Sequence, residues 1–547
     1  MRKGSSRFYV LAILLFLSQL ASAQAQDGGS GSNSYLTILL AAVIIIAFVV
    51  IVQVGDNLLQ IQAKKSGLAK PGRNFSIFPR LGELFAPKLP AYVNGDAATI
   101  LKRGFDIKLE GPAGNKVDRK VKGTTFAMQP PNFRGVAPIP KVVVQVGDTV
   151  KAGDHLFFDK KVTEVKYVSP VSGEIIAINR GARRSIIEVV VLADKEQQYR
   201  KLPSLDFEKA SREELVDFLL DTGGWTLLRQ RPYDIVAQRE CVPGNIFIST
   251  FDTAPLAPDL NQVVEGKGEA FQRGLDVLGK LTGGNVYLGL NANGEDAPSP
   301  VFTEAQGVEK HWFSGCHPAG NVGVQIHHIA PVGPKNTAWT LGVQEVITLG
   351  ALFTEGRFNA ERVVALTGAE LKEPKYVRTY IGASVKELTK GNLVNDHVRF
   401  VSGDVLSGQQ KSAGNFLNFY DDQLTVLEEG DYFDTLGWLV PGKPAPTTSH
   451  SFLNFLFPGT RFKADTNLHG EERAFVMTGQ YEEVLPMDVY PQHLMKAILA
   501  NDYEKMEGLG ILELIEEDIA ICEFACTSKQ PLQRILRTGL DMMHEQG

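Results

Sequence analysis

Residue types that could do chemistry gather in the stretch HWFSGCHPAGNVGVQIHH, residues 311–328. An indole such as Trp312 can stack on a planar ring, and an imidazole such as His317 or His327 can hydrogen-bond a ring carbonyl. Core packing and helix capping explain the same residue types, and we favour that simpler interpretation. Trp312, His317 and His327 are therefore kept only as candidates for contact with a planar ligand.

A second group is the pair Cys522 and Cys526, spaced C-x3-C near a predicted helix. An iron–sulfur cluster normally needs four thiolates and a structural zinc ion needs four ligands, but no further cysteine or histidine lies nearby in the sequence. We predict a packing pair and assign no metal ligand. With four cysteines in 547 residues a disulfide framework is excluded, which favours a reducing compartment.

A third group is the lysine pair in FDKKVTEVKYVSPVSGEIIAI, residues 158–178. A lysine at the tip of a β-hairpin can carry a covalently bound lipoyl or biotin group. The position that best matches a carrier lysine is Val162, and neither Met-Lys-Met nor Asp-Lys-Ala surrounds it. We predict that Lys160 and Lys161 are solvated turn residues without cargo.

Composition excludes other classes of function. A formal charge of -6 and a pI near 6.0 argue against a nucleic-acid partner. The one dense basic cluster is Arg180, Arg183 and Arg184, which we interpret as a solvated strand end. Neither a Ser-His-Asp set nor a catalytic carboxylate pair is recognisable, so no catalytic residue is assigned.

The N-terminus carries two apolar segments. Residues 1–26 have a basic start, a short apolar run and Ala21-Ser22-Ala23, which predicts a signal peptide; an uncleaved anchor is the alternative. Residues 35–54, YLTILLAAVIIIAFVVIVQV, have no charge and are long enough to cross a bilayer as one transmembrane helix. Basic residues follow this span and none lies just before it, which places the large C-terminal body in the cytoplasm.

The rest of the chain reads as an α+β and α/β multidomain protein. Residues 55–104 are predicted to be a linker, and 105–200 a small barrel, because short β-branched runs alternate with Gly-Asp and Ser-Gly turns. Residues 205–355 show strand–helix–strand order typical of a Rossmann-like domain, in which Ser211 to Glu214 form a capping box. A β-rich domain with one helix follows at 360–440, and a mixed to helical region at 441–547.

Several motifs in order resemble one family. The doublet VGDTVKAG followed by SPVSG resembles the barrel-sandwich hybrid of lipoyl and biotinyl domains. FDTAPLAPD, GCHPAGNVGVQIHHIAPV, RTYIGASVKELTKG, SGDVLSG and LELIEEDIAICEFAC resemble the A subunit of sodium-translocating NADH:quinone oxidoreductases. The resemblance runs from about residue 105 to the C-terminus. It implies a β-grasp-like fold for residues 360–440.

The resemblance also implies a function. A member of this family is the peripheral cytoplasmic subunit of a six-subunit respiratory complex in the inner membrane, which passes electrons from NADH to quinone and exports sodium ions. Its partners would be the other subunits, B to F, together with quinone and the membrane. Trp312, His317 and His327 would then be the speculative candidates on the quinone side. The complex uses NADH, flavins, iron–sulfur centres and quinone, but this subunit is expected to hold no redox cofactor itself. The signal-like segment and the transmembrane helix depart from the usual family pattern.

The family is related to the flavin-binding subunit of complex I, where a glycine-rich loop, G-R-G-G-x-G-F-P, lets bare backbone approach the flavin phosphate. The matching segment here is LLRQRPYD, in which Arg229 to Tyr233 fill the loop with side chains and Pro232 lacks an amide donor. A Rossmann G-x-G-x-x-G fingerprint is also missing. We therefore expect neither flavin nor NADH to bind this chain alone, and we assign no cofactor-binding residue.

Two other classes stay open at this stage. A membrane-anchored periplasmic efflux adaptor also joins an N-terminal span to a lipoyl-like barrel, but adaptors usually insert a long coiled coil between the barrel halves. Here both halves lie within about 50 residues, and the charge bias keeps the body inside. A lipoyl or biotin carrier is the second alternative, and it would require a modified lysine.

Overall fold

A computed structural model describes residues 89–93, 97–433, 446–448 and 459–546, together with positions 43, 51, 55, 58, 59 and 62. Residues 1–88 and 89–547 are separate units. The predicted signal peptide lies outside the described residues, and of the predicted span only the helical positions Val43 and Ile51 are described. Within the described part of the chain, no helix combines the length and the apolar character needed to cross a bilayer.

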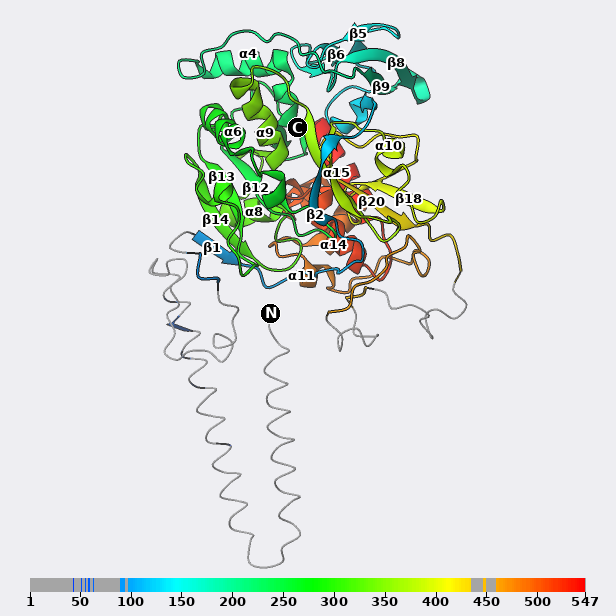
Figure 1. The fold of residues 1–547 in the computed structure, drawn as a ribbon. Coiled ribbons are helices and arrows are strands. Elements are labelled where there is room, and N and C mark those ends of the chain that lie inside the picture. The colour runs from blue at the N-terminus through cyan, green and yellow to red at the C-terminus, as the bar shows by residue number, and fades with distance from the viewer. Residues whose placement is uncertain are drawn as a thin grey trace, which may run out of the picture. The chain divides into compact units, whose positions relative to one another are not determined.

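The small barrel is built from two sheets that share one core (Figure 1). One sheet has the order β3-β9-β8-β5, with bounds Thr125–Met128, Ile186–Ala193, Gly173–Arg180 and Thr149–Val150. The other has the order β4-β6-β7, with bounds Lys141–Val142, His155–Phe158 and Lys166–Val168. The repeated Gly-Asp turns close in the same way, because Asp148 and Asp154 each accept the backbone N–H three residues earlier. These turns confirm the predicted barrel chemistry.

The α/β part is a seven-stranded sheet in the order β1-β14-β13-β12-β15-β10-β11. Its strands are Ala97–Ile100, Glu309–Ser314, Val286–Asn291, Asn245–Ser249, Ala338–Leu341, Arg229–Arg231 and Ile235–Val236. β12 to β15 and β1 pair in parallel, whereas β10 and β11 form an antiparallel hairpin at one edge. The helices are α4 to α9, with bounds Arg212–Thr222, Leu260–Val263, Gly268–Leu281, Pro300–Thr303, Val322–Ile329 and Val343–Thr354.

The local signals for this part are confirmed. α4 begins with a capping box in which the Ser211 hydroxyl accepts the Glu214 N–H and the Glu214 carboxylate accepts the Ser211 N–H. It ends at Gly223, which adopts the left-handed φ of 82° that glycine tolerates. β12, α6 and β13 form the predicted strand–helix–strand unit.

One predicted boundary was wrong. The linker assigned to residues 55–104 ends too late, because β1 at Ala97–Ile100 pairs in parallel with β14 and forms the edge of the α/β sheet. Within the residues 105–200 assigned to the barrel, β2 at Gly114–Val121 joins another sheet, where it pairs in parallel with β17. Both are edge strands whose partners lie far away in the sequence, so their local sequence does not specify the sheet that they join.

The third sheet has the order β19-β18-β20-β16-β17-β2 and carries the short helix α10, Val385–Thr389. Its remaining strands are Gln409–Lys411, Val398–Ser402, Gln423–Glu428, Glu361–Thr367 and Lys375–Tyr380. It is mixed: β16 pairs antiparallel with β17 and parallel with β20. The predicted β-rich region with one helix thus forms, completed by a strand from far earlier in the chain.

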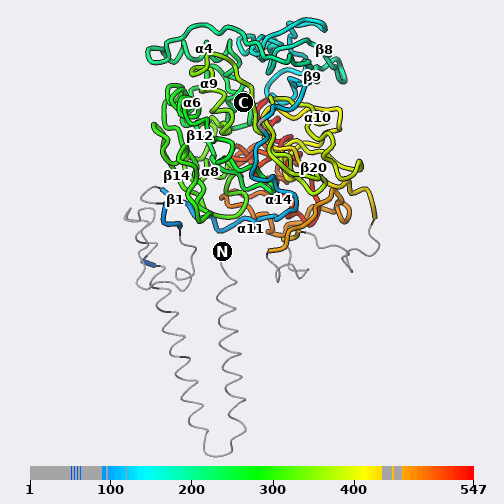
Figure 2. Tube along the Cα trace, in the orientation of Figure 1, coloured from blue at the N-terminus to red at the C-terminus, as the bar shows by residue number. Residues whose placement is uncertain are grey.

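The C-terminal part is helical as predicted, with α11 to α15 at Tyr481–Val484, Pro491–Leu499, Tyr503–Gly508, Glu516–Ala525 and Leu532–Gln546. Its apolar residues share a hydrophobic cluster with Phe313 of β14 and Val324 of α8. In the Cα trace these helices lie between the α/β sheet and the mixed sheet (Figure 2). All parts therefore converge on the region around α14 and α15.

Candidate functional site

A cavity of about 870 Å³ lies where these parts meet. After β12 the chain passes to β13 and β14 on one side of the sheet and then returns to β15 on the other side. The carboxyl ends of β12 and β15, marked by Ser249 and Leu341, line the cavity. In open parallel sheets, ligands bind in the crevice outside such strand ends, at the point where the strand order reverses. The topology alone therefore marks this cavity as the candidate site.

The rest of the lining comes from every other part of residues 89–547. The segment after β3 contributes Asn132 and Arg134, the mixed sheet contributes Asp404 and Tyr420, and α15 contributes Arg537. Asn132 is held in place because its side chain donates to Asn418 and accepts the Phe419 N–H. The cavity thus depends on the packing of all parts against one another.

Four carboxyl groups that line the cavity have raised pKa values, those of Asp252, Asp421, Asp422 and Glu517. Desolvation by the surrounding protein is the largest cause in each case. It raises the pKa of Asp252 to about 6, with a further contribution from the charge of Asp404. It raises the pKa of Asp422 to about 7 and that of Glu517 to about 8. At neutral pH Glu517, and in part Asp422, therefore keep a proton and can donate a hydrogen bond.

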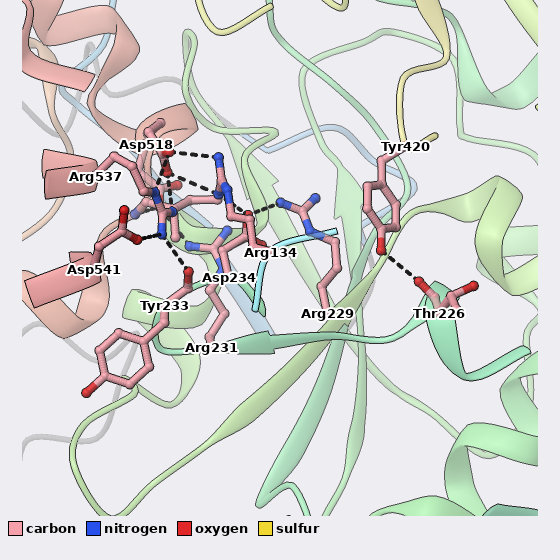
Figure 3. A network of polar contacts seen from close by, with 12 residues as sticks. Arg134, Thr226, Arg229, Arg231, Tyr233, Asp234, Tyr420, Asp518, Arg537 and Asp541 are labelled. Carbon is pink, nitrogen blue, oxygen red and sulfur yellow. Dashed lines mark hydrogen bonds and ion pairs between the residues drawn. The ribbon is translucent and has the colours of Figure 1, made fainter. Parts of the chain in front are cut away.

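One wall of the cavity is a network of arginines and carboxylates (Figure 3). Asp234 is buried and accepts from Arg134 at 2.5 Å and from Arg229. Burial alone would raise the pKa of Asp234, but the charges of Arg229, Arg134 and Arg231 outweigh it and hold that pKa well below its usual range. Arg229 also lies 5.1 Å from the ring centroid of Tyr420, whose hydroxyl donates to the Thr226 carbonyl. These side chains are fixed by one another.

The network continues into the C-terminal helices. Arg231 Nη1 lies 2.9 Å from Asp518 Oδ2, and both side chains are buried. Arg537 makes two bonds to the Glu516 carboxylate, at 2.7 and 2.6 Å, and donates to the Tyr233 carbonyl at 3.0 Å. Ion pairs and hydrogen bonds thus hold the hairpin β10–β11 and the helices α14 and α15 together on one side of the cavity.

The segment predicted to be a side-chain-filled loop at Arg229 to Tyr233 has a different backbone. Arg229–Arg231 form the strand β10, which pairs with β15, and Pro232 and Tyr233 make the turn into β11. The loop prediction was wrong because it followed a related glycine-rich loop, whereas these residues pair with β15 as a strand in which Gln230 and Arg231 are buried. The side chains of Arg229 and Arg231 are engaged in ion pairs with Asp234 and Asp518.

The three residues kept as candidates from the sequence have separate surroundings. Trp312 of β14 packs beside Tyr92, with ring centroids 5.4 Å apart, in the hydrophobic cluster that contains Phe302. Its neighbour Phe313 belongs to the cluster that contains Val324 of α8. Successive strand residues face opposite sides of a sheet, so Trp312 lies on the side away from α8. It is not among the cavity-lining residues.

His327 and His317 are held by structural contacts. His327 Nδ1 donates to Glu513 at 2.7 Å, and its Nε2 accepts the Asp488 N–H at 3.0 Å, which joins α8 to the C-terminal region. His317 is 3% exposed, and its Nδ1 lies 3.2 Å from the Thr253 hydroxyl. Burial lowers the pKa of His317, which favours the neutral ring. Neither histidine lines the cavity.

The other singled-out groups are also described. Cys522 and Cys526 are buried, and the Tyr481 hydroxyl lies 2.9 Å from Cys526 Sγ. Over the described residues, no set of three or more metal-binding side chains is close enough to hold an ion. Lys160 and Lys161 are exposed in a turn organised by Asp159, which accepts the Lys161 and Ala137 N–H groups.

Sequence reasoning missed the acidic residues of the cavity. Asp252 and Glu517 lie within FDTAPLAPD and LELIEEDIAICEFAC, the stretches that carried the family resemblance. Asp422 directly precedes β20, but nothing local distinguishes it from a solvated turn residue. The available signal was the pairing of an acidic residue with the end of a parallel strand, which for Asp252 follows β12 by three positions.

Comparison with known proteins agrees with this architecture. Residues 99–194 match the NqrA N-terminal barrel-sandwich hybrid domain, 210–358 the NqrA second alpha/beta domain and 363–413 the NQRA C-terminal domain. The A subunit of the Na(+)-translocating NADH-quinone reductase of Saccharophagus degradans is 40% identical over 450 residues, which cover 82% of this chain and 99% of the relative. The chain belongs to the NqrA family, the A subunits of Na(+)-translocating NADH-quinone reductases.

Further A subunits of the same reductase are similarly related to this chain. The A subunit from Alcanivorax borkumensis is 38% identical and that from Vibrio anguillarum is 39% identical, each over 82% of this chain and 99% of the relative. Membership of the NqrA family confirms the resemblance found in the sequence. It makes the chain one component of a sodium-pumping oxidoreductase and favours this interpretation over an efflux adaptor or a lipoyl or biotin carrier.

Proposed function

We propose that this chain serves the quinone end of the NADH-quinone reductase, with the ring of the quinone bound in the cavity at the ends of β12 and β15. The observation that carries this proposal is the set of carboxyl groups there whose pKa values are raised by burial. Protonated carboxyl groups donate hydrogen bonds to carbonyl oxygens, and a quinone has two of these oxygens.

The chain contributes no redox cofactor in this proposal. The segment whose sequence matches a flavin phosphate loop forms the strand β10, and its arginines pair with Asp234 and Asp518. The electrons would come from NADH through flavins and iron–sulfur centres held by the partner subunits B to F. The chain's own residues would then bind and orient the quinone and supply hydrogen bonds.

The proposal also gives the chain a cellular location and an orientation in the membrane. The body from residue 89 onward would lie in the cytoplasm as a peripheral part of the inner-membrane complex, and residues 35–54 would anchor it by a single crossing. The charge bias after residue 54 supports this orientation. A reporter that is active only outside the cytoplasm should stay silent when it is fused after residue 100. Strong activity of that fusion would contradict the orientation.

Deleting the chain tests the role in the complex. Membranes from the deletion strain should still oxidise NADH with an artificial acceptor, while quinone reduction and sodium transport should fall together. Unchanged quinone reduction would contradict the proposal.

A cavity-filling substitution tests the binding site. Thr538→Trp on α15 places an indole at the cavity lining, and Glu545→Trp at the exposed end of the same helix is the matched control. Binding of a short-chain quinone to the purified chain should weaken in the first variant only. Equal binding by both variants would place the quinone elsewhere.

A further inference from the structure

Two acidic residues lie in the cavity on different parts of the fold. Asp252 follows β12, and Glu517 is the second residue of α14. Asp252 Oδ1 accepts the Ala254 N–H at 2.7 Å, which fixes its carboxylate. Among the described residues, the Glu517 carboxyl group has no hydrogen-bond partner, although its backbone carbonyl accepts from Asn321. Glu517 is therefore the carboxyl group that is free to bond a ligand.

We propose that Glu517 donates the hydrogen bond that this cavity offers to a carbonyl oxygen of its ligand, and that Asp252 acts as a positioning residue which, after burial and Asp518, helps to keep the proton on Glu517. The inference rests on the proposed binding of quinone in this cavity. It adds a named donor and a reason why that donor is neutral at the pH of the cytoplasm.

Charged groups surround Glu517 on every element packed against it. Asp518 on the same helix and Asp252 across the cavity disfavour its ionised form, whereas Arg231 and Arg229 of β10 favour it. Desolvation and the charges of Asp518 and Asp252 together outweigh the two arginines, so the pKa of Glu517 is raised to about 8. The arginines are weakened as partners because Arg229 bonds Asp234 and Arg231 bonds Asp518.

The pKa values of Asp252 and Glu517 differ. The pKa of Asp252, about 6, is the lower of the two, so Asp252 ionises first as the pH rises. The charge that raises the pKa of Asp252 further is that of Asp404. Near pH 7 the pair therefore carries one proton, on Glu517, beside an ionised Asp252.

The experiment measures the affinity of the purified full chain for a short-chain quinone by calorimetry between pH 6 and pH 9.5. For the unmodified chain, affinity should be constant near pH 6 to 7 and should fall as the pH rises through about 8. Glu517→Gln keeps an N–H donor at every pH, so its affinity should not fall in this range. Glu517→Ala should bind about three- to tenfold more weakly at pH 7, the value of one hydrogen bond.

Asp252→Asn tests the positioning role. It removes a negative charge near Glu517 and lowers the pKa of that group, so the loss of affinity should begin at a lower pH. Glu504→Gln on the exposed side of α13 is the control and should follow the unmodified chain. Circular dichroism at each pH verifies that every variant is folded.

The outcomes separate the two proposals. Quinone binding with no pH dependence, or a Glu517→Gln profile that still falls near pH 8, would overturn this inference and leave the quinone site intact. An Asp252→Asn profile identical to that of the unmodified chain would remove the positioning role. If the chain binds no quinone at any pH, the proposed site and this inference fail together.

Discussion

Arg231 in β10 and Asp518 in α14, 287 residues apart, form an ion pair of 2.9 Å in which the side chains are only 2% and 0% exposed. Asp518 also accepts the Ile515 N–H at the start of α14. The pair joins the edge hairpin of the α/β sheet to the C-terminal helices, and both segments line the cavity. A buried pair of this kind fixes position, since breaking it leaves an uncompensated charge.

Removing one partner of this pair should be costly. Arg231→Met leaves Asp518 buried without a counter-charge and should destabilise the chain by about 3–5 kcal/mol. Urea unfolding followed by circular dichroism measures this. Lys505→Ala breaks the exposed pair with Asp502 and serves as the control, which should leave the midpoint nearly unchanged. A midpoint for Arg231→Met close to that of the control would contradict the structural role given to the pair.

A second prediction concerns Gly223, which ends α4 and packs against Val168 of the barrel. Its φ is 82°, and a Cβ atom there would lie 2.4 Å from Val168 Cγ2 of β7. Gly223→Ala should therefore destabilise by more than about 1 kcal/mol, from both backbone strain and the clash. Because Val168→Ala removes the clash, the cost of Gly223→Ala should be smaller in that background. Equal costs in both backgrounds, measured by urea unfolding, would show that the clash is relieved in another way.

Local patterns predicted the elements but not the partners of edge strands. The capping box of α4, the turns of the barrel and the order β12–α6–β13 follow from neighbouring residues, which is why the sequence indicates them. β1 and β2 pair with strands more than 200 residues away. Pairing across such distances is decided by tertiary packing, which a local segment does not encode.

The candidate site was harder to predict than the fold. The sequence drew attention to Trp312, His317 and His327 because their side chains can bind a planar ligand, but the cavity is lined by other residues. Asp252 and Glu517 become notable only when the strand end and α14 meet. Burial then raises their pKa values, and burial is a property of the assembled fold.

A third prediction tests the carrier alternative. Lys160 and Lys161 are exposed, and the turn is organised by Asp159, so neither ammonium group has a fixed environment. The intact mass of the chain purified from its native host should show no lipoyl or biotinyl addition. The double variant Lys160→Ala, Lys161→Ala should retain quinone reduction in membranes. A mass increase that disappears in the double variant would restore the carrier interpretation.

A fourth prediction concerns flavin. Because Arg229 and Arg231 are committed to carboxylates at the place of the phosphate loop, the purified chain should be colourless and should not oxidise NADH. Absorption spectroscopy and an NADH oxidation assay check both points. A stoichiometric flavin spectrum would mean that the cofactor binds by contacts other than the hairpin.

The last prediction concerns stability and pH. Asp422 lies at the cavity with Oδ1 3.8 Å from Arg362 Nη1, and its side chain is 17% exposed. Desolvation, opposed by Arg362 and supported by Glu345, raises its pKa to about 7. In the unfolded chain an aspartate titrates near 3.9, so between about pH 4 and pH 7 the folded state binds more protons. Stability should therefore fall as the pH rises through this window.

Asp422→Asn should remove this share of the pH dependence. Asparagine imitates the protonated group, so the variant should gain stability relative to the unmodified chain at pH 8 but not at pH 4. The slope of the unfolding free energy with pH should become less negative by up to about 1.4 kcal/mol per pH unit, the value for one proton. Part of the slope should remain, because Asp252 and Glu517 contribute in the same direction. Glu240→Gln at an exposed position is the control. If Asp422→Asn and the control give the same slope from urea unfolding at several pH values, Asp422 is ionised in the folded chain well below pH 7.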